Sequence, residues 1–182
     1  MIHESGPWKK LLLLEARRIE SASRRGISEQ RAINLERGIF LSAYIVRKLH
    51  EAKKLSSGYD DQLVSIQSLP NSGKTPDWTN IHRWDQFFDI GRATAAQLKA
   101  PRLVNVVIHS LILVTLMAEG DQVVGFFVTS DHASKRALYA VGLQDWIRLV
   151  RQVANDEVTE VTRHRLPDGS WQESRAGWRL SP

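Results

Sequence analysis

The sequence contains no cysteine among its 182 residues. This absence excludes disulfide bonds, thiolate metal sites and a cysteine nucleophile, and it favours a protein of the reducing cytoplasm. Long apolar runs are also missing, because the longest, residues 103–118, contains Asn105 and His109 and is shorter than the roughly 20 residues of a membrane-spanning helix. The apolar run at residues 11–14 is too short for a signal peptide. The sequence therefore predicts a cytoplasmic protein with no membrane segment.

Strong metal-binding and nucleotide-binding patterns are absent as well. No two of the six histidines have the spacing of a zinc-binding helix, and none has a cysteine partner. Residues 72–75, Ser-Gly-Lys-Thr, look like the end of a phosphate-binding loop, but Ser68 replaces its leading glycine and Pro70 interrupts its backbone amides. We therefore expect neither a metal nor a cofactor.

The composition, 42% hydrophobic and 25% charged, is typical of a folded globular protein. The length predicts a single domain over residues 1–182, with a helical hairpin in 1–58 and an α+β part in 59–182. Residues 1–58 hold twelve Lys and Arg against six Asp and Glu, which accounts for the basic excess of the whole chain. A basic excess confined to one region indicates an acidic partner such as nucleic acid.

Two amphipathic helices are predicted at the N-terminus. Ser5 and Pro7 are typical of a helix start, Gly26 of a helix end, and Ser28 of the start of a second helix that runs to about residue 55. So short a link between two helices predicts that they pack antiparallel.

The remaining chain shows mainly strand patterns. Residues 111–118 and 122–129 predict a hairpin whose strands are apolar on both faces. Further strands are predicted at 63–69 and 137–141, an amphipathic helix at 143–155, and a terminal hairpin formed by 158–165 and 170–175. The predicted fold class is α+β: an N-terminal antiparallel helical hairpin packed with a small antiparallel sheet, one amphipathic helix and a C-terminal hairpin.

The two apolar faces of the central hairpin also predict self-association. The predicted helices cover one face of the sheet, and the aromatic segment 78–88 covers the other unless a second subunit does so. Trp171 and Trp178 lie in a polar, basic tail, where each fits packing on its own core or anchoring another chain. We therefore expect a homo-oligomer or a protein partner.

A short predicted helix at residues 101–109 carries the chemical groups that could react. Arg102, Asn105 and His109 share one face of this helix because of their spacing. Six residues separate the arginine from the histidine, and a polar residue stands four positions before the histidine. This pattern resembles the motif of the HEPN ribonucleases. The resemblance implies a metal-independent endoribonuclease in which His109 is the general base on a 2′-hydroxyl, Arg102 stabilises the phosphorane charge and Asn105 orients.

A structural interpretation of the same residues stays open. In it, Asn105 caps the helix and the ring of His109 lies at the edge of the core, where a backbone carbonyl holds it. β-rich sequence follows His109 where the HEPN family continues its helix. Ser110 or Ser130 could form a catalytic triad with His109 and Asp131, but no Gly-x-Ser-x-Gly turn accompanies them.

A second candidate surface lies in the N-terminal helices, where Arg17, Arg24 and Arg31 recur every seven residues. They form either a basic stripe that contacts phosphates or an ordinary solvated helix face, since glutamates intersperse. Taken together, the sequence favours a non-enzymatic interaction or accessory protein that self-associates and contacts nucleic acid through these helices. The alternative is the HEPN-like ribonuclease. The two hypotheses differ in whether the side chains of Arg102 and His109 meet in an open cleft or are buried apart.

Overall fold

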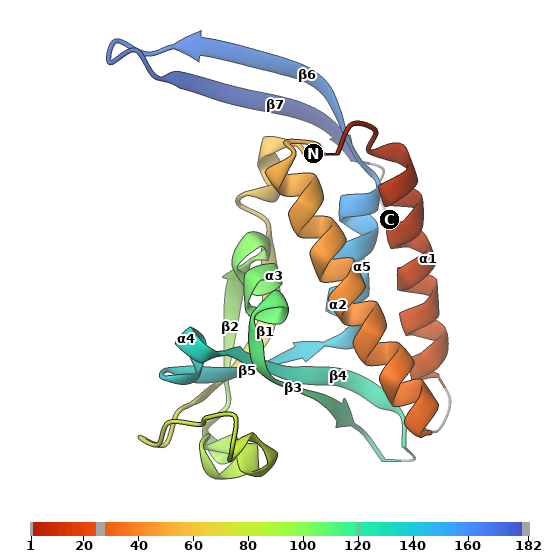
Figure 1. Cartoon of the computed structure of the whole chain (residues 1–182), viewed down its shortest axis with the longest axis vertical. Coiled ribbons are helices and arrows are strands. Elements are labelled where there is room, and N and C mark those ends of the chain that lie inside the picture. The colour runs from red at the N-terminus through yellow and green to blue at the C-terminus, as the bar shows by residue number, and fades with distance from the viewer. Residues whose placement is uncertain (1, 25–27, 120, 180–182) are drawn as a thin grey trace.

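The computed structural model describes residues 2–24, 28–119 and 121–179, with the side chains of 178 and 179 left out. Gly26, the predicted end of the first helix, and the side chain of Trp178 therefore lie outside the described part. The chain begins with two antiparallel helices, α1 (Gly6–Ser23) and α2 (Glu29–Glu51) (Figure 1). Their link is short and α2 begins at Glu29, directly after Ser28, as the sequence predicts.

The central element is a five-stranded sheet in the order β2-β1-β5-β4-β3, with antiparallel neighbours. Its strands are β1 (Leu63–Pro70), β2 (Thr94–Lys99), β3 (Ser110–Met117), β4 (Val123–Ser130) and β5 (Ala137–Gly142). The helices between and after them are α3 (Ala100–Ile108), α4 (Asp131–Ser134) and α5 (Leu143–Ala154), with short 3-10 turns η1 (Ser57–Tyr59), η2 (Ile81–Gln86) and η3 (Ile90–Arg92). The predicted α+β class is confirmed.

Helices cover one face of this sheet. Side chains alternate along β4, so that Phe126 and Val128 enter the main core while Phe127 points to the opposite face. Phe126 meets the ring of Trp146 on α5 edge to face, with 5.7 Å between ring centroids. The indole nitrogen of Trp146 donates a hydrogen bond of 3.2 Å to the hydroxyl of Ser42 on α2. The N-terminal helices, α5 and the sheet thus share one core.

Aromatic side chains cover the other face of the sheet from within the same chain. Trp84, Phe87 and Phe88 pack over Phe127 and Leu138, and the rings of Trp84 and Phe127 lie 5.0 Å apart. The expectation that the segment around residues 78–88 completes the cover is confirmed for these three aromatic residues. A second subunit is therefore not needed to bury this face.

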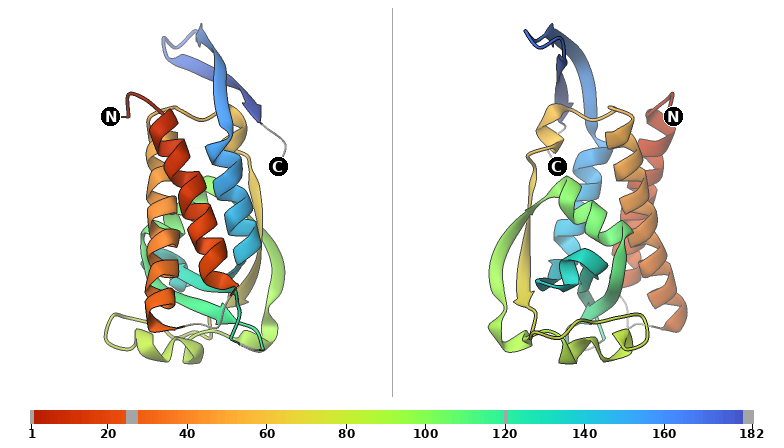
Figure 2. Two further views of the ribbon diagram at one scale, coloured as in Figure 1. Left: turned by 90° about the vertical axis from the view of Figure 1, so that its right-hand side faces the viewer. Right: turned by 60° about the vertical axis from the view of Figure 1, so that its left-hand side comes forward.

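The chain ends in a two-stranded arm formed by β6 (Asp156–Arg165) and β7 (Trp171–Arg179). The arm projects away from the body, as both Figure 1 and Figure 2 show. Its turn contains Gly169 at φ +83°, a left-handed conformation that glycine adopts without steric cost. No helix in the described part of the chain is both long and apolar enough to cross a membrane.

Candidate functional site

The short helix α3 presents the three predicted site residues on its outer face. Leu103, Val104 and Val107 are buried against the core, whereas Arg102, Asn105 and His109 are exposed. Proline in the first turn starts the helix after Lys99. The helix ends at Ile108, where the backbone N–H of His109 donates to the carbonyl of Asn105 over 3.1 Å. Amphipathic spacing therefore turns all three polar side chains toward solvent.

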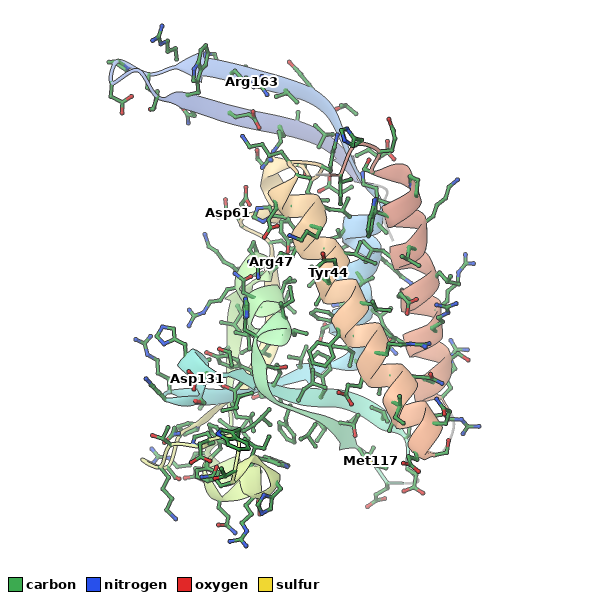
Figure 3. The ribbon with its side chains drawn as sticks, viewed as in Figure 1. Tyr44, Arg47, Asp61, Met117, Asp131 and Arg163 are labelled. Atoms are coloured by element: carbon green, nitrogen blue, oxygen red, sulfur yellow. The ribbon has the colours of Figure 1, made fainter. Side chains whose placement is uncertain are left out.

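These side chains line an open cavity of about 640 Å³. The opposite wall comes from α4 and the residues beside it, and it includes Ser130, Asp131, His132 and Arg136; Asp60 and Lys99 complete the lining. Figure 3 labels Asp131, which marks the α4 wall of the cavity. Arg102 and His109 thus both line one open cavity and are not buried apart from each other.

The structural interpretation of His109 is wrong about its position. Its ring is exposed rather than buried, and its partner is a side chain: Nε2 lies 2.9 Å from a guanidinium nitrogen of Arg47 on α2. Asn105 contributes its backbone carbonyl, not its side chain, to the helix end. The apolar neighbours of His109 in sequence misled the prediction, because adjacent residues of a helix point in different directions.

Arg47 is itself held in place by a carboxylate. Its Nε donates to Glu51 over 2.7 Å, and Lys48 donates to the same carboxylate over 2.7 Å. The hydrogen bonds from Lys48 and then Arg47 lower the pKa of Glu51 to about 2, so Glu51 stays ionised near neutral pH. Since a guanidinium can only donate, this contact is a hydrogen bond when Nε2 of His109 is the acceptor. An unprotonated Nε2 is the state that a general base requires.

Most other charged groups of the cavity are basic. Lys99 forms an ion pair of 2.7 Å with Asp61, whose hydrogen bond raises the pKa of this lysine. Among the acids, Asp60 is already engaged by His50 at 2.6 Å and by Arg175 at 3.6 Å. Lys99, Arg102 and Arg136 outnumber the two acids of the lining, Asp60 and Asp131, which leaves the cavity suited to an anion.

Two further polar groups adjoin the cavity. The hydroxyl of Ser130 accepts a hydrogen bond of 3.2 Å from the backbone of Ala133 and so caps α4, which accounts for this serine without a triad. Asn105 also lines a smaller cavity of about 210 Å³, together with Arg47 and Tyr59. The buried hydroxyl of Tyr59 has no hydrogen-bond partner there, and burial raises its pKa.

Among the residues described, no three His, Asp or Glu side chains are grouped to hold a metal ion.

The N-terminal arginines lie elsewhere. Arg17 and Arg24 belong to α1 and its C-terminal cap, whereas Arg31 belongs to α2, so no single helix presents all three. Arg24 donates to Glu20 over 2.8 Å, and the same carboxylate accepts from Arg151 of α5 over 2.7 Å. Helix α1 and the α3–α4 region stand on opposite sides of the molecule (Figure 1). The predicted basic stripe and the cavity are therefore separate surfaces.

Sequence reasoning missed His132, Arg136 and Arg47. A signal for the first was present, because β3 and β4 pair with Ser110 opposite Ser130. The residue before β3, His109, and the residues after β4 must then lie at the same edge of the sheet. Arg47 comes from a separate helix, and its approach to His109 depends on how α2 packs against α3.

Comparisons with models of known protein families, with curated protein sequences and with solved structures find no significant match to this chain. The geometry of the cavity is therefore the basis for assigning a function.

Proposed function

We propose that the α3–α4 cavity binds a phosphodiester of RNA and that the protein is a metal-independent endoribonuclease. One observation carries the proposal: Arg102, Asn105 and His109 face a single open cavity together with a second histidine, His132. Two imidazoles and nearby guanidinium groups suffice for acid–base cleavage of a ribose-linked phosphodiester.

The proposed reaction is an internal transfer of the phosphoryl group. His109 takes the proton of the 2′-hydroxyl through Nε2, and the 2′-oxygen attacks the phosphorus. The bond to the 5′-oxygen breaks, and protonated His132 gives its proton to that leaving oxygen. Arg102 stabilises the charge on the phosphorane, and Asn105 orients the reacting groups. The products are a 2′,3′-cyclic phosphate and a 5′-hydroxyl end.

Before RNA binds, Arg47 holds the proposed general base, His109, in a hydrogen bond. Its hydrogen bond occupies the nitrogen of His109 that must accept the proton. An arriving phosphate attracts the guanidinium more strongly than a neutral imidazole does, because the bond to phosphate joins two charged groups. Arg47 would then turn to the phosphate and release Nε2 for the 2′-hydroxyl.

The test is cleavage of a single-stranded RNA by purified protein in the presence of EDTA, with the ends of the products identified. Replacing Arg102, His109 or His132 by Ala should each lower the rate, roughly 10²–10⁴-fold for the histidines. His82→Ala, prepared in parallel, is the matched control, because His82 is exposed and does not line the cavity. Equal cleavage by all four variants would point to a contaminating nuclease and reject the proposal.

A non-enzymatic role as a self-associating accessory protein of the cytoplasm is the second candidate. It is favoured by a hollow lined by Ile2, Trp8 and Tyr44 at the surface of α1 and α2. Trp8 and Tyr44 are 36% and 48% exposed, and exposed apolar clusters are typical of protein–protein contacts. Figure 3 labels Tyr44 on α2. Light scattering on Tyr44→Asp and wild type tests this role: a dimer mass lost in the variant, without RNA cleavage by either, supports it.

A further inference from the structure

We infer that the β6–β7 arm is a second contact for the same RNA strand, with a base stacked on Trp171 and the neighbouring backbone held by Arg163 and Arg165. This inference rests on the proposed function, because it extends the α3–α4 cavity into a binding track for single-stranded RNA several nucleotides long.

The base of the arm is fixed to the body by buried polar contacts. Asp156, at the start of β6, is 1% exposed and accepts hydrogen bonds from the backbone and the hydroxyl of Ser56. The ammonium group of Lys9 donates to the backbone carbonyl of the same residue. A Cβ at Gly177 would lie only 2.5 Å from the side chain of Ser56, so glycine permits this close approach. The arm therefore holds a set direction.

One face of the arm is linked to the lining of the cavity by an ion pair. Arg163 lies opposite Glu173 and Arg165 opposite Trp171 in the strand register, so these four side chains share a face. Nearer the body, the same face presents Arg175, which pairs with Asp60 at 3.6 Å. Asp60 itself lines the α3–α4 cavity. The polar face of the arm and the cavity thus meet at one ion pair.

In Figure 1 the arm projects from the end of the molecule where α2 ends, and its tip points toward the side on which α3 and α4 lie. Trp171 is four residues beyond Arg175 on β7, or about 13 Å along the strand. An RNA molecule with one phosphate in the cavity can reach Trp171 only if it is several nucleotides long.

The chemistry of the arm tip fits nucleic acid. Trp171 is 66% exposed, on a ribbon that forms a two-stranded sheet of its own. Exposed aromatic rings with adjacent cations are the stacking platforms of single-strand binding. The acidic groups nearby are already bound: Glu173 accepts from Nε of Arg163 at 2.9 Å and pairs with Lys53 at 3.3 Å, and Asp168 accepts from the hydroxyl and backbone of Ser170. The guanidinium of Arg163 carries further N–H groups that can donate to phosphate.

The experiment compares the affinity of the full chain for an oligouridylate of about ten nucleotides with its affinity for a dinucleotide, using 2′-deoxy substitutions that prevent cleavage. Wild type should prefer the longer probe. Trp171→Ala should reduce that preference about fivefold or more, the loss of one stacked base. Trp171→Phe should keep most of it, and Trp78→Ala, which removes a tryptophan that is 81% exposed elsewhere, should keep all of it.

The outcomes separate this inference from the proposed function. If Arg102→Ala weakens binding of both probes while Trp171→Ala leaves the length preference intact, the arm inference is wrong and the cavity proposal stands. If wild type binds neither probe, both are wrong. If Trp171→Ala instead changes the mass of the protein in solution without affecting RNA, the arm contacts protein and the inference is overturned.

Discussion

Two consecutive phenylalanines test the packing of the sheet from its two sides. Phe126 is fully buried under α5, and Phe127 is 9% exposed under the aromatic cover that includes Trp84. Phe-to-Ala changes in cores cost about 3–5 kcal/mol. We expect Phe126→Ala near the upper end, because it also loses the edge-to-face contact with Trp146. We expect Phe127→Ala near the lower end, since its site opens more readily to water.

These costs translate into clear thermal shifts. For a chain of this size, 1 kcal/mol lowers Tm by about 2–4 °C, which gives falls of about 10–20 °C for Phe126→Ala and about 6–12 °C for Phe127→Ala. Urea and thermal melts followed by circular dichroism measure both. Val124→Ala is the control, because Val124 is 40% exposed on the same strand and should change stability by less than about 1 kcal/mol. If Phe127→Ala behaved like Val124→Ala, the aromatic segment would not cover this face.

Three further results are expected. Arg47→Ala should lower kcat/KM for RNA about tenfold or more while Arg47→Lys keeps part of it, since a charge near the phosphate is retained; equal losses in steady-state kinetics would contradict the charge-based role. The pKa of Glu51 falls from 4.5 unfolded to about 2 folded, so its contribution to stability is complete above pH 4.5 and lost as the pH drops toward 2. Urea midpoints of wild type and Glu51→Gln should therefore converge on acidification, and a constant gap would show that the ion pairs do not matter. Asp156→Ala should cost about 1–3 kcal/mol and expose the base of the arm to proteases, whereas an unchanged digestion pattern would show that other contacts anchor it.

Most of the fold could be predicted from the sequence because its signals are local. The β-branched runs of β3 and β4, the apolar spacing of α5 and the Pro-Asp-Gly turn at residues 167–169 each specify an element without reference to the rest of the chain. Strand β2 was missed because Thr94-Ala95-Ala96-Gln97 has little strand propensity. β2 pairs with β1, with Ile66 opposite Ala96, and the composition of β2 alone does not indicate this pairing.

The candidate site was only half predictable for a related reason. The spacing of Arg102, Asn105 and His109 predicted that they share a helix face, but not which residues stand across from that face. Leu103, Val104 and Val107 pack toward the core and leave the polar face in the open, as the amphipathic pattern indicates. His132 joins the site through the pairing of two strands, and Arg47 through packing of helix α2, so neither follows from a local motif.

The most direct test of the account is the response of the histidine side chains to RNA. In two-dimensional NMR spectra of the imidazole nitrogens, adding a dinucleotide that carries a 2′-deoxy group at the cleavage position should shift the signals of His109 and His132 together. The signal of His82, outside the cavity, should stay in place. Nε2 of His109 should report the loss of its hydrogen bond from Arg47. A ligand-saturated spectrum in which His109 and His132 do not move would contradict the assignment of the α3–α4 cavity as the RNA site.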